Sequence, residues 1–439
     1  MQIVINPSVR EWEKLCSRPL LDFSRLETEV RAIMEDVRNS GDEALRRFSK
    51  KFDGVEVNEL EVSSSELRNS GDYLDQRLKD AISLAAKNIE AFHKAQKPRE
   101  VKVVTMPGVE CRMKYLPVDR VGLYIPGGTA PLFSTVLMLG IPARIAGCRE
   151  VILCTPPDKS GKIHPAILYA ALKSSVTSVY MTGGAQAVAA MAWGTESIPM
   201  VDKIFGPGNQ WVTMAKQIAA SAGIAIDLPA GPSEVAVIAD QSVPASFLAA
   251  DLLSQAEHGE DSQVLLLTTE KSIIEPVQIE IERLLNRLPR KEITGKALDH
   301  CKIIVFDSYD VLMEFINTYA PEHLIIATAN YRQLSEKVRN AGSVFLGNYT
   351  PESAGDYASG TNHTLPTNGF ARAWSGVGTG AFMKRTSFQE ISAEGLKTLG
   401  PMVEFMAQAE ELEAHRQAVK VRLDYITNQS NVSWDQSIH

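Results

Sequence analysis

The stretch that decides the fold begins with the run VGLYIP at residues 121–126. Three more short β-type runs follow it, with a helical stretch before each: EVILCTP (150–156), TSVYMTGG (177–184) and DKIFGPG (202–208). Strands that alternate with helices form a parallel sheet with helices on its faces. The same alternation resumes after a joint predicted at IDLPAGPSEV (226–235). The sequence therefore predicts an α/β fold with two successive Rossmann-like parallel-sheet units.

Helical patterns flank these two units. Apolar positions recur at three- and four-residue spacing in residues 44–53 and 74–96, and a long amphipathic pattern covers residues 396–426. We therefore expect helical segments at both ends of the chain.

Composition excludes several classes of protein. The 439 residues are 44% hydrophobic and 22% charged, which is ordinary for a globular protein. The net charge is −8 and no long basic run occurs, so nucleic acid is not expected as a partner. Because no apolar run reaches 18 residues and no signal-peptide pattern is found, we expect a cytoplasmic protein with no membrane association. The five cysteines, an odd number, are expected to be reduced thiols.

An apolar helical stretch, FLAADLLSQA (247–256), runs into a polar cluster. Gln255 and His258 are three residues apart, so on a helix they share a face, and Gly259 is predicted to end that helix. The two side chains could bind one metal ion. Alternatively, His258 only interacts with the last carbonyl groups of the helix.

Three other stretches carry ionisable groups. Glu322 and His323 precede a buried-looking strand, where they could transfer protons or form a solvated loop pair. The glycine-rich stretch 347–367 has no helix or strand pattern, and it is either a binding loop or an ordinary surface loop. It contains Glu352, Asp356 and His363. In residues 407–419, Glu411 lies four residues before His415 and shares its helical face, whereas Glu410 lies five residues before it and about 140° around the helix. These groups could carry chemistry, or they form a solvated helix face.

Three strand–glycine–helix junctions lie in the first α/β unit. They occupy residues 124–136, 182–190 and 205–212. Such junctions suit an anion or nucleotide at a helix N-terminus. No G-x-G-x-x-G follows a strand, and neither a P-loop nor H-E-x-x-H occurs. The junctions therefore indicate a nucleotide site.

Several long motifs, taken in order, resemble the histidinol dehydrogenase family. They span residues 121–148, 183–209, 227–235, 251–263, 319–324 and 342–367, and the resemblance extends from about residue 40 to residue 420. It implies a homodimer with one Zn²⁺ per subunit. It further implies that L-histidinol is oxidised through L-histidinal to L-histidine with two NAD⁺, in the last steps of histidine biosynthesis.

The resemblance also implies site residues. Zinc ligands fall on Gln255, His258, Asp356 and His415, the last donated by the other subunit of a shared active site. The catalytic pair falls on Glu322 and His323, with His323 as the base and Glu322 activating a water. NAD contacts fall on Tyr124, Gln186 and Asn209. Substrate contacts fall on Ser233, His363 and Glu410 together with the zinc ligands and His323.

The implied domains are an N-terminal helical segment at 1–20, an NAD-binding Rossmann-like domain at 121–235 and an α/β domain formed by 21–120 and 236–380. The last domain carries the zinc and catalytic residues, and a C-terminal helical segment at 381–439 packs on the partner subunit. Two alternatives use the same residues differently. A zinc-dependent hydrolase would need no nucleotide junctions, and a non-catalytic binding protein would need no Glu322–His323 pair.

Overall fold

A computed structural model describes residues 1–18, 23–127, 130–228 and 231–435. The predicted boundary at residue 20, positions 229–230 of the predicted joint and the last four residues lie outside this description. The chain forms two compact units. The first comprises residues 1–97 and 117–382, and the second comprises residues 98–116 and 383–439.

The first unit contains a five-stranded sheet. Its strands are Arg120–Tyr124 (β4), Glu150–Thr155 (β5), Ser178–Met181 (β6), Lys203–Phe205 (β7) and Ala225–Ile226 (β8). They lie in the order β6-β5-β4-β7-β8, and every pair is parallel. The connecting helices are Phe133–Ala146 (α5), Pro165–Ser174 (α6), Gly184–Trp193 (α7) and Gln210–Ser221 (α8). The helical runs of the sequence thus form the crossovers that a parallel sheet requires.

The first unit also contains a six-stranded parallel sheet. Its strands are Gln2–Ile5 (β1), Glu234–Ala239 (β9), Gln263–Thr268 (β10), Lys302–Val305 (β11), His323–Ala327 (β12) and Ser343–Leu346 (β13). They lie in the order β1-β11-β10-β9-β12-β13. The helices of this half are Val9–Leu15 (α1), Ala245–Ala256 (α9), Ile274–Leu285 (α10), Lys291–Asp299 (α11), Tyr309–Tyr319 (α12), Tyr331–Ser335 (α13) and Glu352–Tyr357 (α14).

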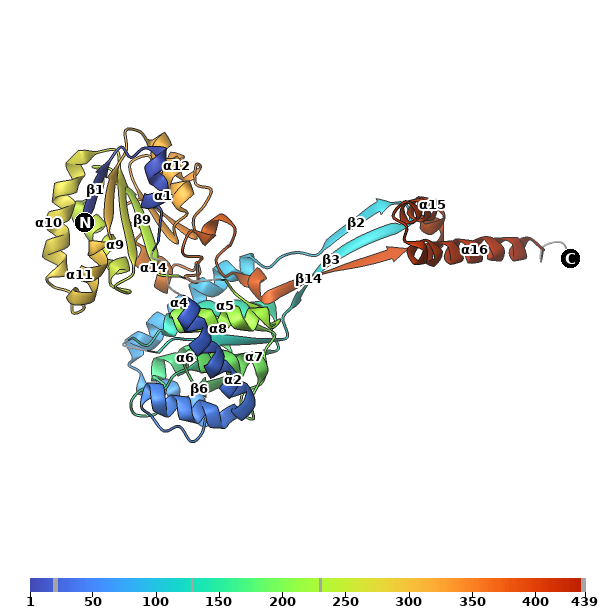
Figure 1. Ribbon diagram of the computed structural model, residues 1–439, viewed down its shortest axis with the longest axis horizontal. Coiled ribbons are helices and arrows are strands. Elements are labelled where there is room, and N and C mark those ends of the chain that lie inside the picture. The colour runs from blue at the N-terminus through green and yellow to red at the C-terminus, as the bar shows by residue number, and fades with distance from the viewer. Residues whose placement is uncertain (19–22, 128–129, 229–230, 436–439) are drawn as a thin grey trace. The chain divides into compact units, whose positions relative to one another are not determined.

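Buried apolar side chains cover both faces of the six-stranded sheet. In β9, Val235 and Val237 pack with α9, α10 and α11, whereas Ala236 and Ile238 pack with α1 and α12 (Figure 1). The faces alternate because successive side chains of a strand point to opposite sides. A strand buried on both faces needs a continuous apolar run, which is why this stretch is recognisable in the sequence.

The two sheets have the same topology. In each, five successive strands take the order third, second, first, fourth, fifth, and β1 adds an edge strand to the larger sheet. This order creates a switch point between the first and fourth strands. The switch points lie between β4 and β7 and between β9 and β12. Two Rossmann-like units, as predicted, are confirmed.

The N-terminal helices pack on the five-stranded half. Phe23–Phe48 (α2) contacts α7 and α8, Ser64–Asn69 (α3) contacts α6, and Gln76–Ala95 (α4) contacts α5 and α6. Helix α2 is interrupted at Gly41, where φ is +53° and the Glu196 carboxylate fills the space that a Cβ would need. Shorter helical turns lie at Ser49–Asp53, Ser70–Tyr73, Lys271–Ile273, Phe370–Arg372 and Thr379–Phe382.

The second unit pairs a small sheet with two helices. Strands Val101–Met106 (β2) and Val109–Pro117 (β3) are antiparallel, and Met383–Ile391 (β14) lies beside β3. Helices Ala393–Ala409 (α15) and Glu413–Asp435 (α16) pack together, with Gly400 against Leu423. A Cβ at Gly400 would lie 2.9 Å from Leu423, so glycine permits the close approach.

Three parts of the predicted domain division differ from the structure. Residues 1–20 begin with a strand, because QIVI pairs in register with β11 through Gln2 and Lys302, a long-range contact that a four-residue run does not reveal. Helices α2–α4 make their main helix contacts with α5–α8 of the five-stranded half, whereas the prediction groups them with the six-stranded half. The C-terminal segment is not wholly helical, since β14 joins a sheet with β3.

All five cysteines are free, in agreement with the prediction of reduced thiols. Within the described ranges, no helix is both long enough and apolar enough to cross a bilayer.

Candidate active site

Glu322 and His323 lie where β12 begins beside β9. His323 is the first residue of β12, and its Nδ1 donates a hydrogen bond to the carbonyl oxygen of Glu234 over 3.1 Å. The backbone N–H of Glu234 donates to Oε2 of Glu322 over 2.9 Å. Because a carbonyl only accepts, this bond assigns the proton of the neutral imidazole to Nδ1. Nε2 of His323 then carries a lone pair and can act as a base.

Helix α14 brings two carboxylates to His323. Oε1 of Glu352 lies 3.5 Å from Nδ1, and Oδ1 of Asp356 lies 3.8 Å from Nε2. The two acids are four residues apart and share a helical face. The prediction that this stretch has no helix is wrong, and no role was predicted for Glu352. Pro351 before the first turn and the four-residue spacing of the acids were the available signals.

Helix α9 ends beside this cluster, two residues earlier than predicted. Ala256 is its last residue and Glu257 its C-cap, so His258 lies beyond the helix. The N–H of His258 still donates to the carbonyl oxygen of Gln255 over 3.2 Å, and this turn preserves the three-residue relation. Gln255 is fully buried, and neither of its amide atoms has a hydrogen-bond partner among the described residues. Such an amide oxygen is free to accept a bond from a water or to ligate a metal ion.

The donors around this point fit a metal ion. His258, Glu352 and Asp356 offer ligand atoms that all lie within 4.8 Å of one another. Zinc binds imidazole nitrogen and carboxylate oxygen at about 2.0–2.2 Å, so such atoms can surround one ion. Oε2 of Glu352 also lacks a partner within the described part of the chain. The cluster therefore fits the predicted zinc, with Gln255 as a neutral donor and Glu352 as an additional candidate ligand.

Burial sets the charges of the cluster. It raises the pKa of Asp356 to about 6 and the pKa of Glu322 and Glu352 well above their ordinary value. It lowers the pKa of His323 to about 3 and that of His363 to about 4. Desolvation disfavours every charged form here. A bound cation would reverse this penalty for the carboxylates, so the site is suited to positive charge.

We expect His258→Asn to lower zinc content. Losing a ligand should weaken zinc binding by at least the roughly 100-fold that loss of an outer-shell partner can cost. Metal analysis of the purified variant, with circular dichroism to verify folding, measures this without an activity assay. His300→Asn is a matched control, because His300 also follows a helix, α11, and is exposed outside the cluster. Full zinc occupancy in His258→Asn would remove His258 from the ligand set.

His363 connects this cluster to the five-stranded half. Its Nδ1 donates to the carbonyl oxygen of Asp356 over 2.9 Å, and its Nε2 accepts from the hydroxyl of Thr135 in α5 over 3.1 Å. Ser233 directly precedes β9 and is half-buried. The structure thus brings Asp356 and His363 together with the predicted catalytic pair.

The predicted nucleotide contacts lie at the carboxyl ends of the five-stranded sheet. Tyr124 ends β4, and its hydroxyl accepts a hydrogen bond from the N–H of Gly184 at the start of α7 over 3.0 Å. Gln186 is buried in the first turn of α7. Asn209 is exposed and caps α8, accepting from the N–H groups of Trp211 and Val212. This edge and its switch point are where a dinucleotide binds in such sheets. Residues 128–129 of the first junction lie outside the described residues.

Glu410 and His415 belong to the second unit, and both are exposed. The predicted continuous helix is interrupted between them. Glu410 is the C-cap of α15, Glu411 has a left-handed backbone with φ of +58°, and α16 begins at Glu413. Helical spacing therefore gives no reason to prefer Glu411 as the partner of His415.

The candidate residues of the two halves lie at opposite ends of their parallel strands. The predicted nucleotide contacts follow the carboxyl ends of β4 and β7, whereas the histidine–carboxylate cluster lies at the amino ends of β9 and β12. A Rossmann-like half joined to a half with a buried histidine and a group of possible metal ligands fits an enzyme that binds a nucleotide cofactor in one half and a substrate in the other.

Comparisons with known proteins agree. The family model described as histidinol dehydrogenase matches residues 16–423. A curated histidinol dehydrogenase of Bacteroides thetaiotaomicron is 54% identical over 424 residues, covering 97% of this chain and 99% of the relative. One of Haemophilus influenzae is 50% identical, covering 96% of this chain and 99% of the relative. The crystal structure of histidinol dehydrogenase from Elizabethkingia anophelis is 52% identical with a TM-score of 0.94, covering 97% of this chain and 99% of that one. This chain belongs to the histidinol dehydrogenase family.

Proposed function

We propose that this chain oxidises L-histidinol through L-histidinal to L-histidine, with one zinc per subunit and two NAD⁺ per turnover. The observation that carries the proposal is that Nε2 of His323 lies 3.8 Å from Oδ1 of Asp356, an acid that also belongs to the group of possible metal ligands with His258 and Glu352. The names of the relatives support the same substrate. When bound, NAD⁺ would accept hydride and zinc would hold the amine and imidazole of the substrate.

His323 is the proposed base. Its Nδ1–H is held by the Glu234 carbonyl, so Nε2 remains free to take the proton of the substrate hydroxyl. Burial lowers the pKa of His323 to about 3, which keeps the imidazole unprotonated before the reaction and also makes it a weaker base than an exposed histidine. The side chain is only 6% exposed, so bulk water has little access to the proton-transfer position.

Glu322 is proposed to activate the water that adds to the aldehyde. One oxygen accepts from the N–H of Glu234, which fixes the carboxylate and leaves its other oxygen for a water. Burial raises the pKa of Glu322, which makes its carboxylate a stronger base. His363, held by Thr135 and by the Asp356 carbonyl, and Ser233 are proposed to contact the substrate.

The nucleotide is proposed to bind at Tyr124, Gln186 and Asn209. These residues lie at the start of α7 and α8 or at the end of β4, where backbone N–H groups favour phosphate. A cytoplasmic location, predicted from the sequence, stays a prediction.

A homodimer with a shared active site is also proposed. Helix α15 exposes Met402, Phe405 and Met406 at 62%, 73% and 63%, and α16 exposes Val421 at 55%. Contiguous apolar side chains of this size mark an interaction surface. Glu410, the C-cap of α15, and His415, near the start of α16, are exposed in the same unit, and we propose that the partner subunit receives them.

The zinc-loaded chain should produce two NADH for each L-histidinol consumed. Absorbance gives the NADH, and chromatography of the product gives L-histidine. L-Histidine formed with one NADH per histidinol, or no NADH formation at all, would overturn the proposed four-electron oxidation. Histidinal supplied directly should yield one NADH, which separates the second oxidation from the first.

A further inference from the structure

Glu234, the first residue of β9, forms a buried ion pair with Arg18. Nε and Nη2 of Arg18 each donate to one carboxylate oxygen of Glu234 over 2.9 Å. The backbone N–H of Asn368 donates to Oε1 over 2.8 Å. The Glu234 side chain is 0% exposed and that of Arg18 is 6% exposed. The carboxylate is therefore fully paired and fixed in one position.

The backbone of the same residue holds both proposed catalytic side chains. The N–H of Glu234 donates to Glu322, and its carbonyl accepts from His323. Any displacement of this single peptide segment would move the water-activating carboxylate and the base together.

Arg18 also binds the segment that leads into the pair. Its Nη2 donates to the carbonyl oxygen of Tyr319 over 2.7 Å, and its guanidinium lies 3.8 Å from the centroid of the Tyr319 ring. Tyr319 ends α12, and only Ala320, with φ of +52°, and Pro321 separate it from Glu322. One guanidinium thus connects the start of β9 to the turn before β12.

A buried pair of this kind contributes little net stability, because desolvation offsets the Coulombic attraction. Its geometry, by contrast, is specific, since the planar guanidinium has donors in a fixed fork. We propose that Arg18 and Glu234 are positioning residues for Glu322 and His323. This inference rests on the proposed roles of those two residues.

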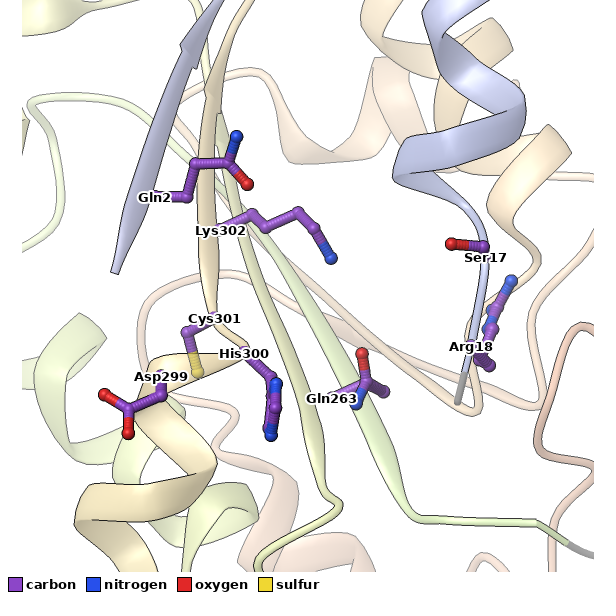
Figure 2. A pocket seen from close by; sticks show the side chains of 8 residues that line it. All are labelled: Gln2, Ser17, Arg18, Gln263, Asp299, His300, Cys301 and Lys302. Atoms are coloured by element: carbon purple, nitrogen blue, oxygen red, sulfur yellow. The ribbon is translucent and has the colours of Figure 1, made fainter. Parts of the chain in front are cut away.

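The surroundings of Arg18 provide a direct test. Arg18 lines a cavity of about 340 Å³ with Gln263, His300 and Lys302, and Figure 2 shows the Lys302 side chain extending into it. A small guanidinium compound can therefore reach the position that the Arg18 side chain leaves when it is shortened.

Arg18→Ala should lower kcat by about 100-fold, the loss expected for a misplacement of about 1 Å, with KM for histidinol and NAD⁺ and zinc content little changed. Millimolar methylguanidinium should restore part of kcat in Arg18→Ala and leave the wild type unaffected, with equal NaCl as the ionic control. Lys302→Ala removes another cation that lines the same cavity, from the start of β11, and should keep the wild-type kcat. Arg18→Lys keeps the positive charge but lacks the planar guanidinium. Its kcat should fall by about 10-fold, and methylguanidinium should raise that kcat only weakly.

Arg18→Ala should also cost less in a Glu322→Gln background than in the wild type, because the part of its effect that acts through Glu322 is already lost there. An unchanged kcat, or a rise in KM alone, overturns the inference. If Arg18→Ala does not fold, kcat and KM of Arg18→Lys decide instead: an unchanged kcat, or a rise in KM alone, again overturns the inference. A wild type that forms no NADH would instead overturn the proposed function, so the two failures are distinguishable.

Discussion

His323→Asn should lower kcat for histidinol oxidation by about 1,000-fold while KM changes less than about twofold. Loss of a general base costs typically 10²–10⁴-fold, and about 1,000-fold corresponds to roughly 4 kcal/mol of transition-state stabilisation. Asparagine can keep a donor toward the Glu234 carbonyl, as Nδ1 of His323 does, so the backbone of β12 need not move. What it cannot replace is Nε2, the atom that lies 3.8 Å from Oδ1 of Asp356.

Steady-state kinetics at saturating NAD⁺ measures this effect, and zinc analysis of the same preparation shows that the metal cluster is intact. His300→Asn, at an exposed C-cap, is the control for histidine replacement and should be indistinguishable from the wild type. A tenfold or smaller loss of kcat in His323→Asn would assign the base to another group.

Two inactive subunits should restore activity when they are mixed. His258→Ala removes a proposed ligand from the first unit, and His415→Ala removes the one proposed to come from the partner. A twofold-symmetric dimer makes such an exchange reciprocal. In a heterodimer, one site then collects both defects and the other none, so about half of the wild-type activity per dimer should return.

The mixture must be dissociated and reassembled, and native mass spectrometry must show the heterodimer. Co-assembled His258→Ala and Asp356→Ala subunits are the matched control, because both residues belong to the first unit and each site keeps one defect. Heterodimers of the first pair without activity would place His415 in the site of its own chain or in no site.

The sequence predicts the strands of both halves because strands buried on two faces must be continuously apolar, as residues 235–239 are. It does not predict β1, since QIVI is a strand only through its pairing with β11, which is about 300 positions away in the chain. Nor does it predict where the helices of residues 23–95 pack, because an amphipathic pattern states that a face is buried and not what covers it.

The candidate site also contains residues that the sequence indicates and residues that it does not. Gln255, His258 and the Glu322–His323 pair are candidates in the sequence because polar groups adjoin apolar runs there, Asp356 is a candidate because it lies in a glycine-rich stretch, and the family resemblance implies their roles. Glu234 and Arg18 were missed because each resembles an ordinary charged residue in sequence, and their pairing spans 216 positions. Glu411 was an attractive partner for His415 only while the helix was assumed to be continuous, and its left-handed backbone removes that reason.

The segment that contains His363 has a consequence for how the first unit unfolds. Next to the His363–Thr135 bond, Asn362 donates to the Met138 carbonyl of α5 and to Nε2 of His93 in α4. These groups are buried, so exposing them by separating the halves would leave polar atoms unpaired until water enters. Local opening of the six-stranded half must therefore break bonds made by the other half. We expect the two halves, which have the same strand order, to unfold as one cooperative unit. The backbone amides of the segment that joins them should then exchange slowly, at rates similar to those of the two sheets.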